Sequence, residues 1–105
     1  MINYGKQNID ASDIEAVINA LKRDYITQGP LVDEFENDLN KYFKSKFSCA
    51  VSSGTGALHL IGLALGWKKN DIVITTPITF ISTANSILYS NATPCLVYIN
   101  MNDYT

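Results

Sequence analysis

Three hydroxyl residues and two glycines lie together in "VSSGTGALHL", residues 51–60, of a chain with only six glycines. An apolar run typical of a strand precedes them, and an apolar run typical of a helix follows. A turn in that position presents free backbone amides at the amino end of a helix, where the helix dipole favours an anion such as phosphate. The residues therefore indicate an anion cradle, with an ordinary helix cap as the alternative.

The spacing of this turn does not match the common phosphate motifs. A dinucleotide fingerprint that starts at Gly54 needs glycine where His59 lies, and no Gly-Lys-Ser/Thr follows at the spacing of a nucleotide-phosphate loop. The pattern predicts an anion without saying which one.

A second turn, in "TTPITFISTAN", residues 75–85, follows the next apolar run. It emerges at the carboxyl end of a predicted strand, the edge at which open α/β folds bind ligands. The aromatic ring of Phe80 could lie flat on a ring-shaped ligand there. The alternative is that Phe80 fills the core at the start of its helix.

The predicted elements alternate between helix and strand after the first two helices. A capping box at Ser12 and Glu15 is expected at the first helix, and Pro30 in the first turn of the second. Continuous apolar strands between helices indicate an α/β fold with a parallel sheet covered on both faces. The predicted helices span 11–23, 31–43, 56–67 and 80–90, the predicted strands 47–51, 71–76 and 95–99, and "NATP", 91–94, is a predicted turn.

Composition excludes several classes of partner. A globular chain of 105 residues is indicated by 47% hydrophobic and 17% charged residues, and a net charge of −2 favours neither nucleic acid nor an anionic membrane. No segment is apolar for long enough to cross a bilayer, so a soluble cytoplasmic protein is expected. Cys49 and Cys95 are expected to be buried free thiols, and the single histidine, His59, cannot complete a metal site with them.

Four segments together resemble a known family. "YGKQNID", "ITQGPLVDEFE", "CAVSSGTGALHL" and "DIVITTPITFISTANSILYSNATPCLVYIN" stand in the order and spacing of the amino-terminal part of the DegT/DnrJ/EryC1/StrS sugar-nucleotide aminotransferases. The "TTPITFISTAN" segment is similar to the branch that aminates UDP-linked 4-keto-6-deoxy sugars for pseudaminic acid. The resemblance implies the large domain of a fold-type-I aminotransferase, pyridoxal phosphate as cofactor, glutamate as amino donor, and a homodimer for the full-length enzyme.

The resemblance also assigns roles to residues. It implies that Gly54, Thr55 and Gly56 hold the cofactor phosphate and that Phe80 stacks on the pyridoxal ring. It implies that the sugar nucleotide is lined by the segment before the Gln-Gly pair and by the arm, at Tyr4, Tyr25, Ile26, Thr27 and Gln28.

The acid–base machinery of transamination is not among these residues. In relatives, the Schiff-base lysine and the carboxylate that holds the pyridine nitrogen protonated lie beyond the equivalent of residue 105. The resemblance thus implies an amino-terminal fragment, with an arm and two helices in 1–46 and a partial cofactor-binding domain in 47–105, and no transamination by the fragment alone. The alternatives are a stand-alone phosphate- or nucleotide-binding module and a truncated chain without activity.

The strand at 47–51 is the weak point of such a fragment. In the family fold, strands from later in the chain separate it from the strand that corresponds to 71–76. Without them its edges lack partners, so the chain alone is expected to be unstable. If the chain does fold, 47–51 could pair directly with 71–76 as an ordinary crossover.

Overall fold

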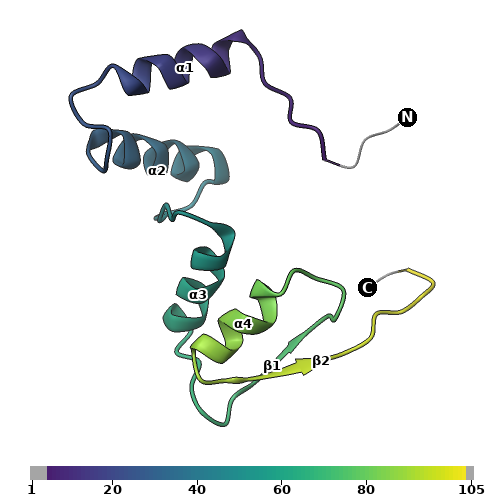
Figure 1. Cartoon of the computed structure of the whole chain (residues 1–105). Helices are drawn as coiled ribbons and strands as arrows, with labels where there is room; N and C mark the ends of the chain where they lie inside the picture. Colours follow the sequence, from purple (N-terminus) through teal and green to yellow (C-terminus); the bar gives the residue numbers. More distant parts are fainter. Residues whose placement is uncertain (1–4, 104–105) are drawn as a thin grey trace. The chain divides into compact units, whose positions relative to one another are not determined.

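The computed structural model describes residues 5–103, in a chain that divides into two compact units, Met1–Ala50 and Val51–Thr105 (Figure 1). Each unit is described by itself. The first holds two helices, and the second holds two helices and two strands. The proposed domains 1–46 and 47–105 stay a prediction.

Helix α1 (Ala11–Leu21) begins at a capping box, but not at the predicted one. The Asp10 carboxylate accepts hydrogen bonds from the amides of Ser12 (2.8 Å) and Asp13 (3.2 Å), and the Asp13 carboxylate accepts one from the Asp10 amide (2.9 Å). The prediction of Ser12 and Glu15 was wrong because the helix already includes Ser12, so its hydroxyl lies past the cap position. The Ser12 hydroxyl instead donates to Asp10 (2.6 Å).

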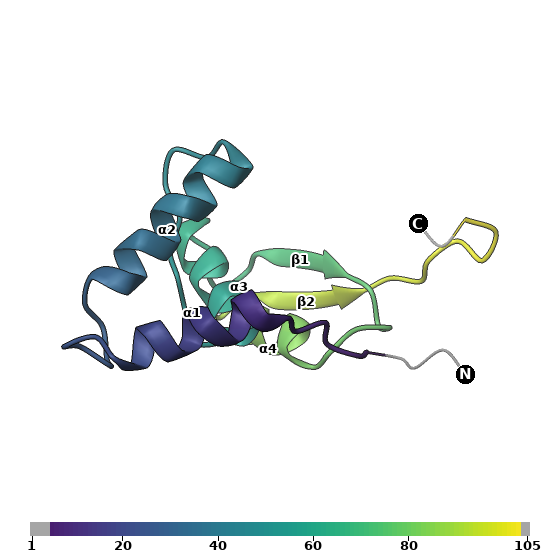
Figure 2. The same ribbon diagram turned by 90° about the horizontal axis from the view of Figure 1, so that it is seen from above.

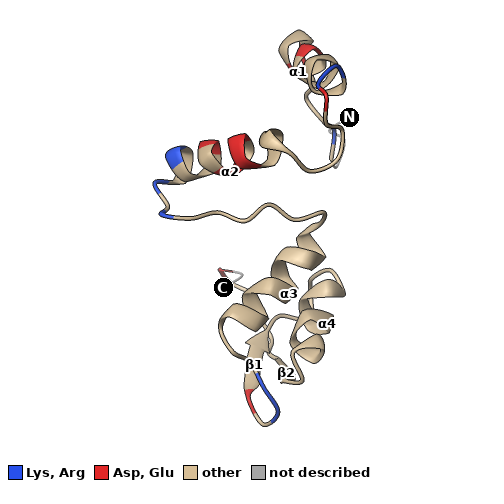
Figure 3. Cartoon of the chain, turned by 90° about the vertical axis from the view of Figure 1, so that its left-hand side faces the viewer, with Lys and Arg blue, Asp and Glu red and all other residues tan. Residues whose placement is uncertain are grey.

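Helix α2 (Pro30–Phe43) begins with Pro30, as predicted, where the fixed φ of proline suits the first helical position. Its charged side chains are mainly acidic (Figure 3). Two side chains of α2 hold the segment that follows the helix. The Glu36 carboxylate accepts a hydrogen bond from the Ala50 amide (2.7 Å), and the Asn40 side chain accepts one from the Ser48 hydroxyl (2.7 Å).

The predicted strand at 47–51 is therefore wrong for this chain, and it does not pair with the strand at Ile72–Thr75. A strand needs a neighbour that satisfies its amides and carbonyls. The described residues give 47–51 no strand neighbour, and the Ala50 amide donates instead to a helix side chain.

In the second unit, α3 (Gly54–Ala64), β1 (Ile72–Thr75), α4 (Ser82–Tyr89) and β2 (Thr93–Leu96) follow one another. The two strands are parallel, with Ile72 opposite Thr93, and lie side by side in Figure 2. The α/β class, the two helices and the strand predicted at 71–76 are confirmed.

Strand β2 starts and ends earlier than the predicted strand at 95–99. Thr93 and Pro94 therefore belong to the strand, and the predicted turn at 91–94 is wrong at its end. The amides of Thr93 and Val97 donate to carbonyls at Asp71 and Thr75, both at 2.9 Å. Because alternate residues of a strand point their amides to opposite sides, the Pro94 nitrogen faces away from β1. Proline is tolerated there because no ladder hydrogen bond is lost.

Helices α3 and α4 pack closely at Gly62. A Cβ atom on Gly62 would lie 2.6 Å from Ser90 Oγ and 2.7 Å from Trp67 Cε3. Ser86 and Ser90 are buried along α4, Ile87 is 2% exposed, and neither helix carries a charged residue (Figure 3). Small side chains thus allow two uncharged helices to approach each other.

Helix α4 covers only one face of the sheet. Val73 and Thr75 are half-buried, whereas Ile72 and Ile74 on the other face are 69% and 67% exposed. The predicted cover on both faces is wrong for the second unit because neither of its helices packs on that second face.

The predicted burial of the two thiols is also wrong. Cys49 is exposed because its segment joins no sheet, and Cys95 is half-buried because the two-stranded sheet is incompletely covered. Both thiols are free, as predicted.

Candidate functional site

The amino end of α3 presents two backbone amides that have no partner among residues 5–103. Ser53 caps the helix: its side-chain oxygen accepts from the Gly56 amide (3.1 Å) and its carbonyl accepts from the Ala57 amide (3.1 Å). The amides of Gly54 and Thr55 come before the first possible intrahelical bond, so they point out of the helix unpaired. These two amides and the helix dipole are the donor set that an anion needs.

The space around the two glycines differs. A Cβ atom on Gly54 would meet nothing within 4 Å, while one on Gly56 would lie 3.6 Å from Ser53 Oγ and 3.7 Å from Val51 Cβ. Room for an anion is thus found at Gly54. The Gly56 amide is already engaged by the cap, and alanine at 56 would make only ordinary contacts.

The second turn, between β1 and α4, carries Phe80 two residues before the helix. The Phe80 ring is 73% exposed, so it does not fill the core of the described second unit. An exposed ring just past the carboxyl end of a strand is available to a planar ligand.

The two turns lie at the same end of the second unit. Both α3 and α4 run back from the carboxyl end of β1 toward its amino end (Figure 1). Gly54 and Thr55 at the start of α3 therefore share this end with Phe80, which precedes the start of α4. The assignment of these residues to phosphate and to ring stays a prediction, and their shared end of the unit is compatible with it.

The predicted substrate residues Tyr25, Ile26, Thr27 and Gln28 form the turn between α1 and α2, in the first unit. Tyr25 and Ile26 are exposed. Gly29 has a φ of 82°, and a Cβ there would lie 3.0 Å from Tyr25 Cβ, so the turn requires glycine at 29. Tyr4, also predicted, lies outside the described residues.

An ion pair closes this turn. Arg23 Nη1 lies 2.8 Å from Glu34 Oε1, and both side chains are about half exposed. The hydrogen bond from Arg23 lowers the pKa of the Glu34 carboxyl below its ordinary value. A cavity of about 220 Å³ lies beside the pair, lined by Arg23, Asp24, Tyr25, Pro30 and Leu31.

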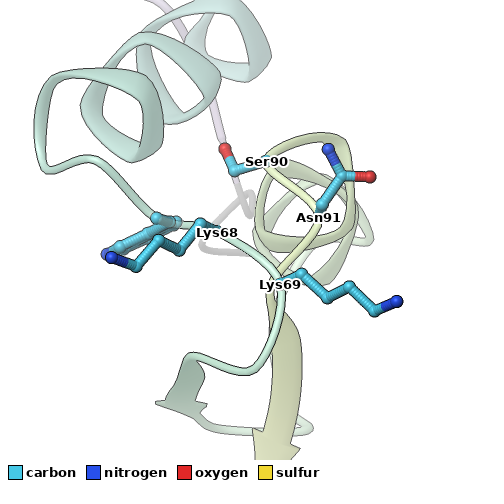
Figure 4. Close-up of a pocket in the computed structure, with 5 residues that line it drawn as sticks. Lys68, Lys69, Ser90 and Asn91 are labelled. Atoms are coloured by element: carbon cyan, nitrogen blue, oxygen red, sulfur yellow. The ribbon is translucent and has the colours of Figure 1, made fainter.

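A larger cavity, of about 670 Å³, lies at the other end of the second unit, beside the turns before β1 and β2. Lys68 and Lys69 line it but extend to opposite sides (Figure 4). The Ser90 hydroxyl, also at its wall, donates to the Ser86 carbonyl. These groups do not converge on a ligand, and the amino end of a parallel sheet is not where open α/β folds bind one.

Other kinds of site find no support within residues 5–103. No group of three His, Cys, Asp or Glu residues there is arranged to hold a metal ion. No helix in that part of the chain is long and apolar enough to cross a membrane.

A helix cap was the alternative that the sequence left open at the first turn, and Ser53 supplies it, while the Gly54 and Thr55 amides stay free. One feature of the site was not predicted from the sequence, a hydrogen bond of 2.9 Å between the hydroxyls of Thr79 and Thr83, on either side of Phe80. Its only signal was two threonines four residues apart.

Comparison of the sequence with protein families identifies a family for most of the chain. A model described as the DegT/DnrJ/EryC1/StrS aminotransferase family matches residues 7–105. A curated relative from Campylobacter jejuni subsp. jejuni serotype O:23/36 (strain 81-176), UDP-4-amino-4,6-dideoxy-N-acetyl-beta-L-altrosamine transaminase, is 51% identical over 92 residues, which are 88% of this chain and 24% of the relative. The chain spans about a quarter of the length of the curated relatives it matches.

Solved structures agree with the fold. Spr1654 of Streptococcus pneumoniae, in its PLP-form, superimposes with a TM-score of 0.86 at 29% identity, over 98% of this chain and 26% of that protein. PseC of Helicobacter pylori, an aminotransferase involved in the biosynthesis of pseudoaminic acid, superimposes with a TM-score of 0.84 at 32% identity, over 93% of this chain and 27% of PseC.

Proposed function

The chain belongs to the DegT/DnrJ/EryC1/StrS aminotransferase family, and from this we propose that it supplies part of the cofactor site of a pyridoxal-phosphate-dependent sugar aminotransferase. The proposed substrate is a UDP-linked 4-keto-6-deoxy amino sugar, with glutamate as the amino donor. The transaminase from Campylobacter jejuni, at 51% identity, supports this substrate class.

One observation carries the proposal: unpaired amides and an exposed aromatic ring lie at the same end of the second unit. The amides of Gly54 and Thr55 and the Thr55 hydroxyl would hold the cofactor phosphate. Phe80 would stack on the pyridoxal ring, where its face also keeps water away. Bound there, pyridoxal phosphate would supply the electron sink that transamination requires.

The remaining roles are proposed from the family. Tyr25, Ile26, Thr27 and Gln28 would line the sugar nucleotide, with Tyr4 from the arm. The lysine that bonds to the cofactor is proposed to lie beyond residue 105, so the 105-residue chain is not expected to transaminate. The complete enzyme is proposed to be a cytoplasmic homodimer.

A chimera tests the proposal. In the PseC chimera, residues 1–105 replace the matching segment of Helicobacter pylori PseC, so that this chain must build its share of the cofactor site. The folded chimera should take up pyridoxal phosphate with a visible absorbance band that borohydride removes. A folded chimera with no such band, or with a band that borohydride leaves unchanged, would refute the proposal. Binding of inorganic phosphate without the cofactor would instead favour a phosphate-binding module.

Two substitutions in the PseC chimera test the residues. Thr55→Ala should weaken cofactor binding by roughly 10- to 150-fold, because a hydrogen bond to a charged group contributes about 1.5–3 kcal/mol. Phe80→Ala should weaken it as well. Thr93→Val is the matched control, since Thr93 is an exposed threonine at the amino end of β2. If neither Thr55 nor Phe80 affects binding, the site assignment is wrong even where the family is right.

A further inference from the structure

Helix α4 begins without a side-chain cap. Its N-cap residue, Ile81, has no side chain that can accept a hydrogen bond from the first turn. The turn before the helix is held instead by the Thr79–Thr83 hydroxyl pair, whose Oγ1 atoms are 2.9 Å apart. The Thr83 amide also donates to the Phe80 carbonyl (3.0 Å). The hydroxyl pair thus spans Phe80 and the two residues after it, and the amide bond ends on the Phe80 carbonyl itself.

Side-chain packing does not hold the Phe80 ring. Phe80 is exposed, and so are its apolar neighbours Ile78 and Ile81. The direction of the ring therefore depends on the backbone of the turn. Earlier in the turn, the Ile78 amide donates to Thr76 Oγ1 at 3.3 Å, so the Thr79–Thr83 bond is the shorter of the two side-chain hydrogen bonds that hold the turn.

We infer that Thr79 and Thr83 are positioning residues for the cofactor: their mutual hydrogen bond fixes the turn so that the Phe80 ring is held ready to stack. This inference rests on the proposed function. Neither hydroxyl needs to touch the cofactor, because the pair acts through the backbone on either side of Phe80. A ring already held in its stacking position loses less conformational entropy when the cofactor binds, so the cofactor would bind more tightly.

The alternative is a purely structural role, in which the hydroxyl pair only stabilises the start of α4. The two differ in what happens when Phe80 is absent. A structural role persists in a Phe80→Ala protein, whereas a role exerted through the ring disappears with it.

Valine substitutions in the PseC chimera measure the effect, since valine keeps the shape of threonine and removes the hydroxyl. Thr79→Val and Thr83→Val should each weaken pyridoxal phosphate binding about 2- to 10-fold, the range of one neutral hydrogen bond. The double variant should be no weaker than the single ones, because both remove the same bond. Thr79→Ser and Thr83→Ser should restore affinity, and Thr93→Val should leave it unchanged.

The decisive measurement combines Thr79→Val with Phe80→Ala. We expect no further loss of cofactor affinity beyond that of Phe80→Ala, and we expect Thr79→Val alone to alter the circular dichroism of the bound cofactor. Equal losses from Thr79→Val with and without Phe80, or additive losses from the two valines, would overturn the inference. So would valine variants that bind as tightly as the unmodified chimera. An unmodified chimera that binds no cofactor would instead refute the proposed function, and this inference with it.

Discussion

Replacing Gly62 with alanine tests the contact that joins α3 to α4. The new Cβ atom would lie 2.6 Å from Ser90 Oγ and 2.7 Å from Trp67 Cε3. Neither neighbour can yield easily. The Ser90 side chain is buried, with its hydroxyl bonded to the Ser86 carbonyl, and the Trp67 contact is with the fused ring itself.

The expected magnitude follows from two opposing terms. Alanine in place of glycine inside a helix is favourable by about 1 kcal/mol. Overpacking of a close contact costs about 1–3 kcal/mol. The free energy of unfolding should therefore fall by up to roughly 2 kcal/mol in Gly62→Ala.

Gly56→Ala is the matched control in the same helix. Its Cβ would make only ordinary contacts, so the variant keeps the favourable helix term without the clash. Urea-induced unfolding of the PseC chimera, followed by far-ultraviolet circular dichroism, should place Gly62→Ala about 1–3 kcal/mol below Gly56→Ala. Equal stability of the two variants would show that α3 and α4 do not approach each other at Gly62.

Two further predictions concern the chain itself. The isolated 105-residue chain should show no cooperative thermal transition, because α1 and α2 bury no residue and Ile72 and Ile74 lie on an open sheet face; a sharp calorimetric peak would contradict this. The Arg23–Glu34 pair should stabilise its turn fully at pH values above 4.5, the ordinary carboxyl pKa of Glu34. This stabilisation should be lost as the pH falls through the lowered pKa that Glu34 has in the folded state. Nuclear magnetic resonance titration should show the Glu34 pKa rising in Arg23→Gln, and an unchanged value would disprove the pairing.

The features that the sequence predicted correctly are those with a local cause. Pro30 starts α2 because its own ring fixes φ. The first amides of α3 are free because an intrahelical bond needs a carbonyl four residues earlier, and those residues lie before the helix. The exposure of Phe80 was one of two readings of the sequence. The sequence predicts that Phe80 follows the carboxyl end of a strand, but it does not show whether other residues cover the ring.

The predictions that failed depended on partners that the pattern does not reveal. The run 47–51 has strand-forming residues, yet no described strand pairs with it, and its Ala50 amide donates to the Glu36 carboxylate on α2. Pro94 has a strong turn signal, yet it fits in β2 because its nitrogen faces the unpaired edge. In each case a neighbour distant along the chain outweighed the local propensity.

The proposed cofactor site combines both kinds of determinant. The donors at Gly54 and Thr55 are local to α3, and the ring of Phe80 is local to the turn before α4. Their placement at one end of the unit depends on how the two helices pack, and at Gly62 that packing leaves no room for a Cβ atom beside Ser90. A side chain at 62 would shift one helix along or away from the other, and so would move the ring relative to the amides. The glycine would thus contribute to the proposed site at a distance of two helical turns from the Gly54 and Thr55 amides.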